Sequence, residues 1–153
     1  MNDNKEMEKD DLFSKAEGKL YNYNKIKVEI ECLDIDIDYL KKDIQGCKAI
    51  IYENERTGNT NNTSNPIEAE VLKKEKEIQQ KTKERNHKEK IVKKIDKAMT
   101  ILDEQEMNVL KYRYFSNRRK APKWEYIANM TGYSEKNCRV IKDELVNKIK
   151  NMI

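Results

Sequence analysis

The sequence has little of what a zinc-bound or disulfide-stabilised fold needs. Of its 153 residues only four are glycine and two are proline. Its three cysteines, Cys32, Cys47 and Cys138, form no Cys-x-x-Cys pair, and the only histidine, His87, is not spaced from them as a zinc ligand would be. Unpaired thiols of this kind are typical of a reducing cytosol. We therefore expect no metal site.

Catalytic motifs are absent as well. The few glycines form no phosphate-binding loop, and no nucleophile motif occurs. Asp34, Asp36 and Asp38 alternate along a predicted helix, so their carboxylates do not converge on one point. We therefore expect a protein that is not an enzyme, with no cofactor and no small-molecule substrate.

Long hydrophobic runs are also missing. No stretch approaches the roughly 20 apolar residues that cross a membrane. The acidic start, MNDNKEMEKDD, lacks the apolar segment of a signal peptide. We therefore expect a cytoplasmic protein without a membrane partner.

What the sequence does contain is charge and helix-forming residues. Charged residues make up 39% of the chain and hydrophobic residues 37%, and Lys, Glu, Ile and Leu dominate, which is typical of long helices. The predicted fold class is all-α. The charge is uneven, since residues 111–153 hold 11 Lys and Arg against 4 Asp and Glu, a net of +7, where the whole chain has +4. A basic segment of this kind is expected of a domain that contacts phosphates.

A heptad pattern predicts a long coiled-coil module at residues 12–100, after a disordered start at residues 1–11. The apolar seam of its first helix, which ends near Glu53, consists of Ile26, Ile30, Leu33, Ile37, Leu40, Ile44, Cys47 and Ile51. The polar residues 54–65 predict a loop, and Pro66 predicts the start of a second long helix. Either the two helices fold back as an antiparallel hairpin, or the seam pairs with the same helix of another subunit in a homodimer.

The apolar pattern of the second helix is interrupted in its middle. Lys81, Arg85 and Lys88 occupy positions where the seam would continue. A helix whose seam is charged cannot bury that part away from water. We therefore expect this part of the helix to be exposed or frayed.

The last third of the chain, residues 101–153, predicts a helix-turn-helix domain. Asp103 and Glu106 have the spacing of a capping box at its first helix. Further on, Gly132 allows the positive φ of a sharp turn, and Ser134 is suited to cap a basic second helix. The residues predicted to build the core and turn of the motif are Trp124, Ile127, Ala128, Gly132, Ser134, Cys138, Ile141 and Leu145. With the local charge, this motif predicts binding to double-stranded DNA.

The segment from Ile101 to Met152 resembles region 4, the DNA-binding C-terminal part of sigma-70-family factors. Cys138 stands where that family usually has valine, and an acidic coiled coil takes the place of the promoter-melting region. The closer resemblance is to small phage and prophage regulators of the ArpU and RinA kind from Gram-positive bacteria. It implies a transcriptional regulator, with RNA polymerase as a further partner. The matching residues are Glu104, Glu106, Val109, Leu110, Arg113, Tyr114, Trp124, Ile127, Ala128, Gly132, Ser134, Cys138, Arg139, Ile141 and Leu145.

The resemblance also implies which residues meet DNA. The recognition helix would run from Glu135 to about Asn151 and lie in the major groove. Trp124 would anchor the core of the domain and would not stack on a base. The expected contacts to base edges are Lys136, Asn137, Arg139 and Lys142. The expected contacts to phosphates are Arg113, Arg118, Arg119, Lys120 and Lys123.

Two other functions fit the same sequence. A small terminase subunit, which binds DNA for packaging, also joins a helix-turn-helix to an oligomerising coiled coil and would form a ring of many subunits. An interaction protein that binds RNA polymerase or a sigma factor would use the acidic coiled coil and show no affinity for DNA.

Overall fold

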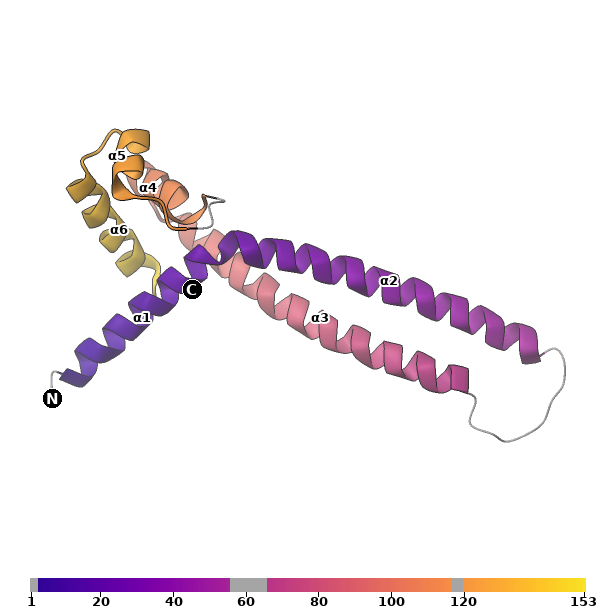
Figure 1. The fold of residues 1–153 in the computed structure, drawn as a ribbon. Helices are drawn as coiled ribbons and strands as arrows, with labels where there is room; N and C mark the ends of the chain where they lie inside the picture. The colour runs from indigo at the N-terminus through magenta and orange to yellow at the C-terminus, as the bar shows by residue number, and fades with distance from the viewer. Residues whose placement is uncertain (1–2, 56–65, 117–119) are drawn as a thin grey trace. The chain divides into compact units, whose positions relative to one another are not determined.

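The protein is all-α. The computed structural model describes residues 3–55, 66–116 and 120–153, and no strand occurs in these ranges. Two compact units make up the chain, which we call the terminal unit (Met1–Lys27 with Lys90–Ile153) and the central unit (Val28–Glu89). None of the described helices is long and apolar enough to cross a membrane. The helices, coloured in chain order in Figure 1, are α1 (Asp3–Tyr21), α2 (Tyr23–Glu55), α3 (Pro66–Met99), α4 (Glu104–Tyr114), α5 (Trp124–Thr131) and α6 (Glu135–Ile149).

Residues 3–11 are helical, which corrects the disorder that the sequence predicts for residues 1–11, of which the first two lie outside the described residues. Helix α1 begins at Asp3, and its first turns are rich in Glu, Lys and Met, which favour helix. A break at Asn22 then divides what the sequence pattern predicts as one helix. The side-chain amide of Asn22 donates to the carbonyl oxygen of Gly18 at 2.8 Å, and its backbone N–H donates to the same oxygen at 3.2 Å. Asn22 therefore satisfies a carbonyl at the end of α1.

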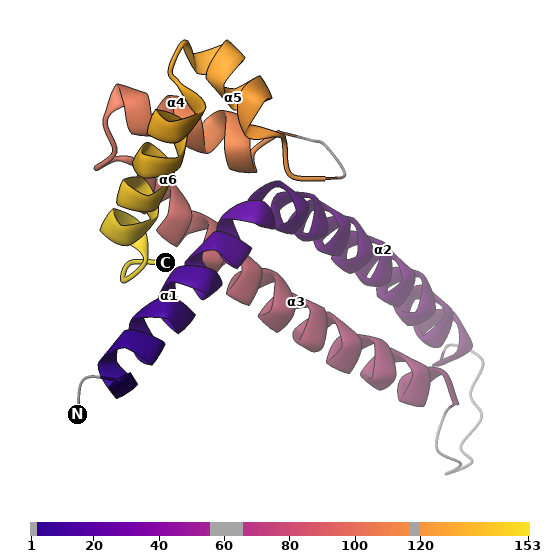
Figure 2. The same cartoon turned by 60° about the vertical axis from the view of Figure 1, so that its left-hand side comes forward.

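In the central unit, α2 and α3 run antiparallel and side by side, as both views show (Figures 1 and 2). Leu33, Ile37 and Ile44 of the predicted seam are buried, as is Val71 of α3. Their burial supplies the apolar contact between the two helices. Of the other seam residues, Ile26, Ile30, Leu40 and Cys47 are half-buried, and the side chain of Ile51 and most of the predicted loop 54–65 lie outside the described residues.

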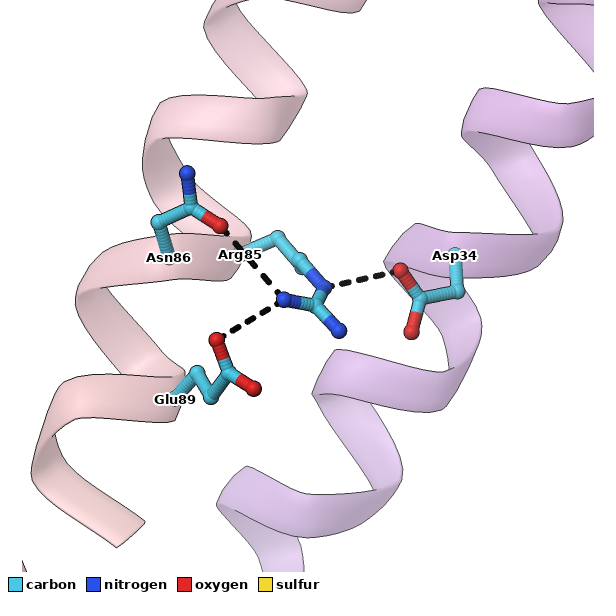
Figure 3. A network of polar contacts seen from close by, with 4 residues as sticks. All are labelled: Asp34, Arg85, Asn86 and Glu89. Carbon is cyan, nitrogen blue, oxygen red and sulfur yellow. Dashed lines mark hydrogen bonds and ion pairs between the residues drawn. The ribbon is translucent and has the colours of Figure 1, made fainter. Parts of the chain in front are cut away.

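The charged stretch of α3 is ordered and paired, so the prediction that it is exposed or frayed is wrong. Figure 3 shows Arg85 of α3 reaching across to Asp34 of α2. The Nε atom of Arg85 lies 2.9 Å from Oδ1 of Asp34, and Nη1 donates to Oε2 of Glu89 at 2.9 Å. The guanidinium group is thus held between two carboxylates, one from each helix.

Two lysines repeat this arrangement one turn away on either side. Lys81 donates to Oδ2 of Asp36 at 2.9 Å, and Lys88 donates to Oε2 of Glu29 at 2.8 Å. The sequence pattern of α3 alone could not reveal this, because the partners are acids of α2. Half-exposed ion pairs of this kind hold the charged heads at the surface, while the methylene groups cover the seam.

The core of the terminal unit is built by helices from both ends of the chain. Helices α4, α5 and α6 pack on one another, and α1 packs against α6; Figure 2 shows this group from a second side. The predicted domains differ from this division, because they place α1 with the coiled coil. Among the described residues, the largest fully buried side chains all lie in this unit and are Leu20, Ile95, Val109, Leu110, Ile127, Cys138, Leu145, Val146 and Ile149.

Helix α1 is joined to α4 by Tyr114. Its hydroxyl group donates to Oε1 of Glu17 at 2.6 Å, and its ring lies edge-on to Tyr21 at 4.6 Å between centroids. Burial, followed by the hydrogen bond to Glu17, raises the pKa of Tyr114 above its ordinary value. The phenol therefore stays protonated and keeps donating to the carboxylate.

A second aromatic contact joins the start of α2 to the ends of α3 and α4. The ring of Tyr23 stacks on Phe115 with centroids 4.5 Å apart. Its hydroxyl group donates to Oδ1 of Asp96 at 2.5 Å. These contacts hold the first turn of α2 within the terminal unit.

Candidate nucleic-acid interface

The turn between α5 and α6 has the geometry that its sequence predicts. Gly132 ends α5 in the left-handed region with φ 76°, and its N–H donates to the carbonyl oxygen of Ala128 at 2.9 Å. Ser134 caps α6, because its hydroxyl oxygen accepts from the N–H of Asn137 at 3.2 Å. Only three residues therefore separate α5 from α6.

The predicted core of this motif is largely buried. Ile127, Cys138, Ile141 and Leu145 are buried, and Ala128 is half-buried. Gly132 and Ser134 are exposed, as residues of a turn and a cap usually are.

Trp124 departs from the prediction that it anchors the core. It is only half-buried, and two guanidinium groups lie over its ring. The central guanidinium carbon is 4.5 Å from the ring centroid for Arg113 and 5.6 Å for Arg139. The indole ring is thus a platform for cations at the edge of the domain.

The outward face of α6 presents three of the four predicted base contacts. Lys136, Asn137 and Arg139 are exposed in the first two turns of the helix. Nη2 of Arg139 also lies 3.3 Å from Oε2 of Glu135, one turn earlier. Because both side chains are exposed, water and salt weaken this ion pair. Arg139 can therefore exchange Glu135 for another partner.

Lys142, the fourth predicted base contact, is turned toward α1. Its side chain is only 16% exposed, with Nζ 3.4 Å from Oε1 of Glu17 and 2.7 Å from Oδ1 of Asp143. Nζ also lies 5.0 Å from the ring centroid of Phe13. The packing of α1 on α6 therefore gives Lys142 internal partners. Phe13 and Glu17, one helical turn apart, form a contact surface for α6 that sequence reasoning missed.

Arg113, a predicted phosphate contact, is also directed inward. Its Nη1 atom donates to the carbonyl oxygen of Pro122 at 2.8 Å, and its guanidinium group lies over the rings of both Tyr21 and Trp124. The Nε atom is buried and has no hydrogen-bond partner in the described parts of the chain. Arg113 therefore holds the connector that precedes α5 against α4.

The other predicted phosphate contacts lie in the basic connector between α4 and α5, residues 116–123. Lys120 and Lys123 are exposed just before α5. Arg118 and Arg119 lie outside the described residues. The two lysines are therefore available at the N-terminal end of α5.

A comparison with protein-family models gives a match that covers most of the chain. The model described as a protein of unknown function (DUF722) matches residues 20–151, nearly the whole chain, and the chain belongs to this family. No curated protein matches the sequence, and no solved structure does.

Proposed function

We propose that this member of the DUF722 family is a sequence-specific, DNA-binding transcriptional regulator of phage or prophage type. It acts in the cytoplasm and docks α6 in the major groove of double-stranded DNA. The observation that carries the proposal is the exposure of Lys136, Asn137 and Arg139 on the first turns of a helix that follows a tight glycine turn. In this motif the first turns of the second helix lie nearest the base edges.

The chemistry of the three side chains suits base readout. An arginine or lysine donates to O6 and N7 of guanine, and an asparagine pairs with N6 and N7 of adenine. Lys120 and Lys123 supply cations beside this helix pair for phosphates, which position a protein without reading sequence. Lys142 and Arg113 have partners within the protein, so the proposal does not depend on them.

The experiment that tests the proposal joins a mass measurement to a DNA-binding measurement. The full chain is studied by light scattering, alone and with double-stranded fragments from a random library and from beside its own gene. A monomer or dimer that binds one sequence supports a regulator. A ring of many subunits with site-tolerant binding supports a terminase subunit instead. A chain with no affinity for any fragment overturns DNA binding and favours an interaction protein.

Two variants then separate base contacts from phosphate contacts. Arg139→Ala is expected to weaken binding to the selected sequence by about 1–3 kcal/mol and binding to scrambled DNA far less. Lys123→Gln is expected to weaken binding to both DNAs. It should also reduce the slope of log affinity against log salt concentration by about one, because one fewer counterion is released. Lys73→Gln, an exposed lysine of α3 in the central unit, serves as the control. Equal losses on both DNAs for Arg139→Ala would make Arg139 a backbone contact.

A further inference from the structure

Two aromatic rings and two guanidinium groups of the terminal unit lie in a row, in which ring and cation alternate. Arg113 lies over the ring of Tyr21, at 5.6 Å from its centroid, and over the ring of Trp124, at 4.5 Å. Arg139 lies 5.6 Å from the centroid of the same indole. The row therefore begins at α1, crosses α4 and α5, and ends on the exposed face of α6.

The two arginines at Trp124 differ in their surroundings. Arg113 is tied to the carbonyl oxygen of Pro122 at 2.8 Å and is part of the packed domain. Arg139 is exposed, and it also contacts the exposed carboxylate of Glu135, 3.3 Å away. Trp124 thus connects a fixed arginine to one that faces solvent.

We infer that Trp124 is a positioning residue, whose ring holds the Arg139 side chain extended across α5 in the direction of the groove. The inference rests on the proposed function, since it assigns Arg139 its orientation for a base contact. An arginine side chain in solvent has many rotamers, and a partner must suppress them when it binds. A ring that already restricts the guanidinium group removes part of that penalty before DNA arrives.

Glu135 has a different role in this arrangement. Its carboxylate competes with the base for the same guanidinium group, and it sits in the first helical turn, where an acid is favoured by the helix dipole. Trp124 does not compete, because a ring face leaves the N–H groups at the guanidinium edge free to donate. The edge is the part that pairs with O6 and N7 of guanine.

The experiment is a double-mutant cycle on DNA binding, with the sequence selected above as the probe. Trp124→Leu, Arg139→Ala and the double variant are compared with the unaltered chain by binding isotherms. Trp124→Leu is expected to weaken specific binding about three- to tenfold in the unaltered background, and by much less in the Arg139→Ala background. Trp124→Phe keeps a ring and is expected to lose less than Trp124→Leu.

Each result supports or overturns the inference. Equal losses from Trp124→Leu in both backgrounds would mean that Trp124 acts only through the fold, and would leave the proposed function intact. If the unaltered chain binds no DNA, the proposed function fails and the inference fails with it. Should Trp124→Leu not fold, as judged by its helicity, Trp124→Phe completes the cycle. Met130→Ala, an exposed apolar residue of α5, is the control that is expected to show no coupling to Arg139.

Fluorescence supplies a readout in the absence of DNA. Trp124 is the only tryptophan of the chain, so its emission reports directly on what lies over its ring. Arg139→Ala is expected to change this emission in the free protein, and Lys136→Ala, on the same exposed face of α6, is expected to leave it unaltered. An emission that does not respond to Arg139→Ala would overturn the positioning role, even for a chain that binds DNA.

Discussion

The ammonium group of Lys148 lies 2.6 Å from Oε1 and 2.8 Å from Oε2 of Glu106, a residue 42 positions earlier in the chain. The same carboxylate accepts from the backbone N–H of Asp103 at 2.9 Å, and Asp103 in turn accepts from the N–H of Glu106. One buried carboxylate thus completes the predicted capping box, which the structure confirms, and also fixes the last turn of α6 to the start of α4.

Two substitutions of Glu106 separate these roles. Glu106→Gln keeps an oxygen for the cap but removes the charge next to Lys148. Glu106→Ala removes both but leaves Asp103 capping the helix, and loss of the hydrogen bond to the N–H of Asp103 alone is expected to destabilise the domain by about 1 kcal/mol. Urea unfolding, monitored by helicity, should therefore give the highest free energy of unfolding for the unaltered chain, a lower one for Glu106→Gln and the lowest for Glu106→Ala. Glu104→Gln, an exposed acid of the same first turn, is the control, and an equal effect at Glu104 would contradict a specific role for Glu106.

In the central unit, two isoleucines two positions apart should respond differently. Ile37 is 6% exposed and Ile35 is 68% exposed. Ile37→Ala leaves a cavity in the seam and is expected to lower the free energy of unfolding by about 2 kcal/mol or more. Ile35→Ala is expected to change it by no more than about 0.5 kcal/mol. Urea unfolding measures both, and similar values would mean that the seam does not hold α2 against α3.

Replacing a glycine of the turn and a glycine of α1 with alanine is expected to change the stability in opposite directions. Gly132 has φ 76°, so Gly132→Ala places a side chain in a left-handed backbone and is expected to destabilise by about 1 kcal/mol. Gly18 lies within α1 with nothing within 4 Å of an added Cβ atom. Gly18→Ala is therefore expected to stabilise by about 0.5–1 kcal/mol. Thermal unfolding of both variants tests this, and a stabilising Gly132→Ala would contradict the turn geometry.

Tyr23 should give the terminal unit a stability that depends on alkaline pH. Burial, followed by the hydrogen bond to Asp96, raises the pKa of Tyr23 from 10.0 to about 12. The folded state holds the phenolic proton more tightly than the unfolded state does. The contribution is therefore complete below pH 10.0 and is lost as the pH rises to about 12.

A titration of tyrosine absorbance tests this directly. Tyr23 is expected to ionise with a pKa of about 12 in the unaltered chain, and Tyr23→Phe is expected to remove this step from the titration. Tyr23→Phe should also reduce the loss of stability over the same pH range. Identical titrations of the unaltered chain and of Tyr23→Phe would show that the hydroxyl group of Tyr23 is not protected from ionisation.

The parts of the fold that the sequence predicts well are those encoded locally. The cap at Asp103, the turn at Gly132 and the cap at Ser134 each depend on side chains within a few residues of the backbone groups that they satisfy. The all-α class follows from the same local preferences. These features need no knowledge of distant segments.

The features that the sequence could not predict depend on contacts between distant residues. Tyr114 and Glu17 are 97 positions apart, and their hydrogen bond helps to place α1 in the terminal unit. That placement in turn explains why Lys142, which looks like an exposed cation in its own helix, is covered by α1. The apolar face that Trp124 starts predicts a place in the core, yet two arginines lie over its ring.

The ion pair between Arg85 of α3 and Asp34 of α2 favours the observed alignment of the two helices. An apolar seam alone would tolerate a shift by one heptad, because another apolar residue would fill each vacated place. A shift in either direction would bring Lys41 or Lys27 opposite Arg85 in place of Asp34, and two cations would face each other in the seam. We therefore expect the charge of Arg85, in the middle of α3, to disfavour these shifted alignments, so that it adds specificity where the apolar residues supply stability.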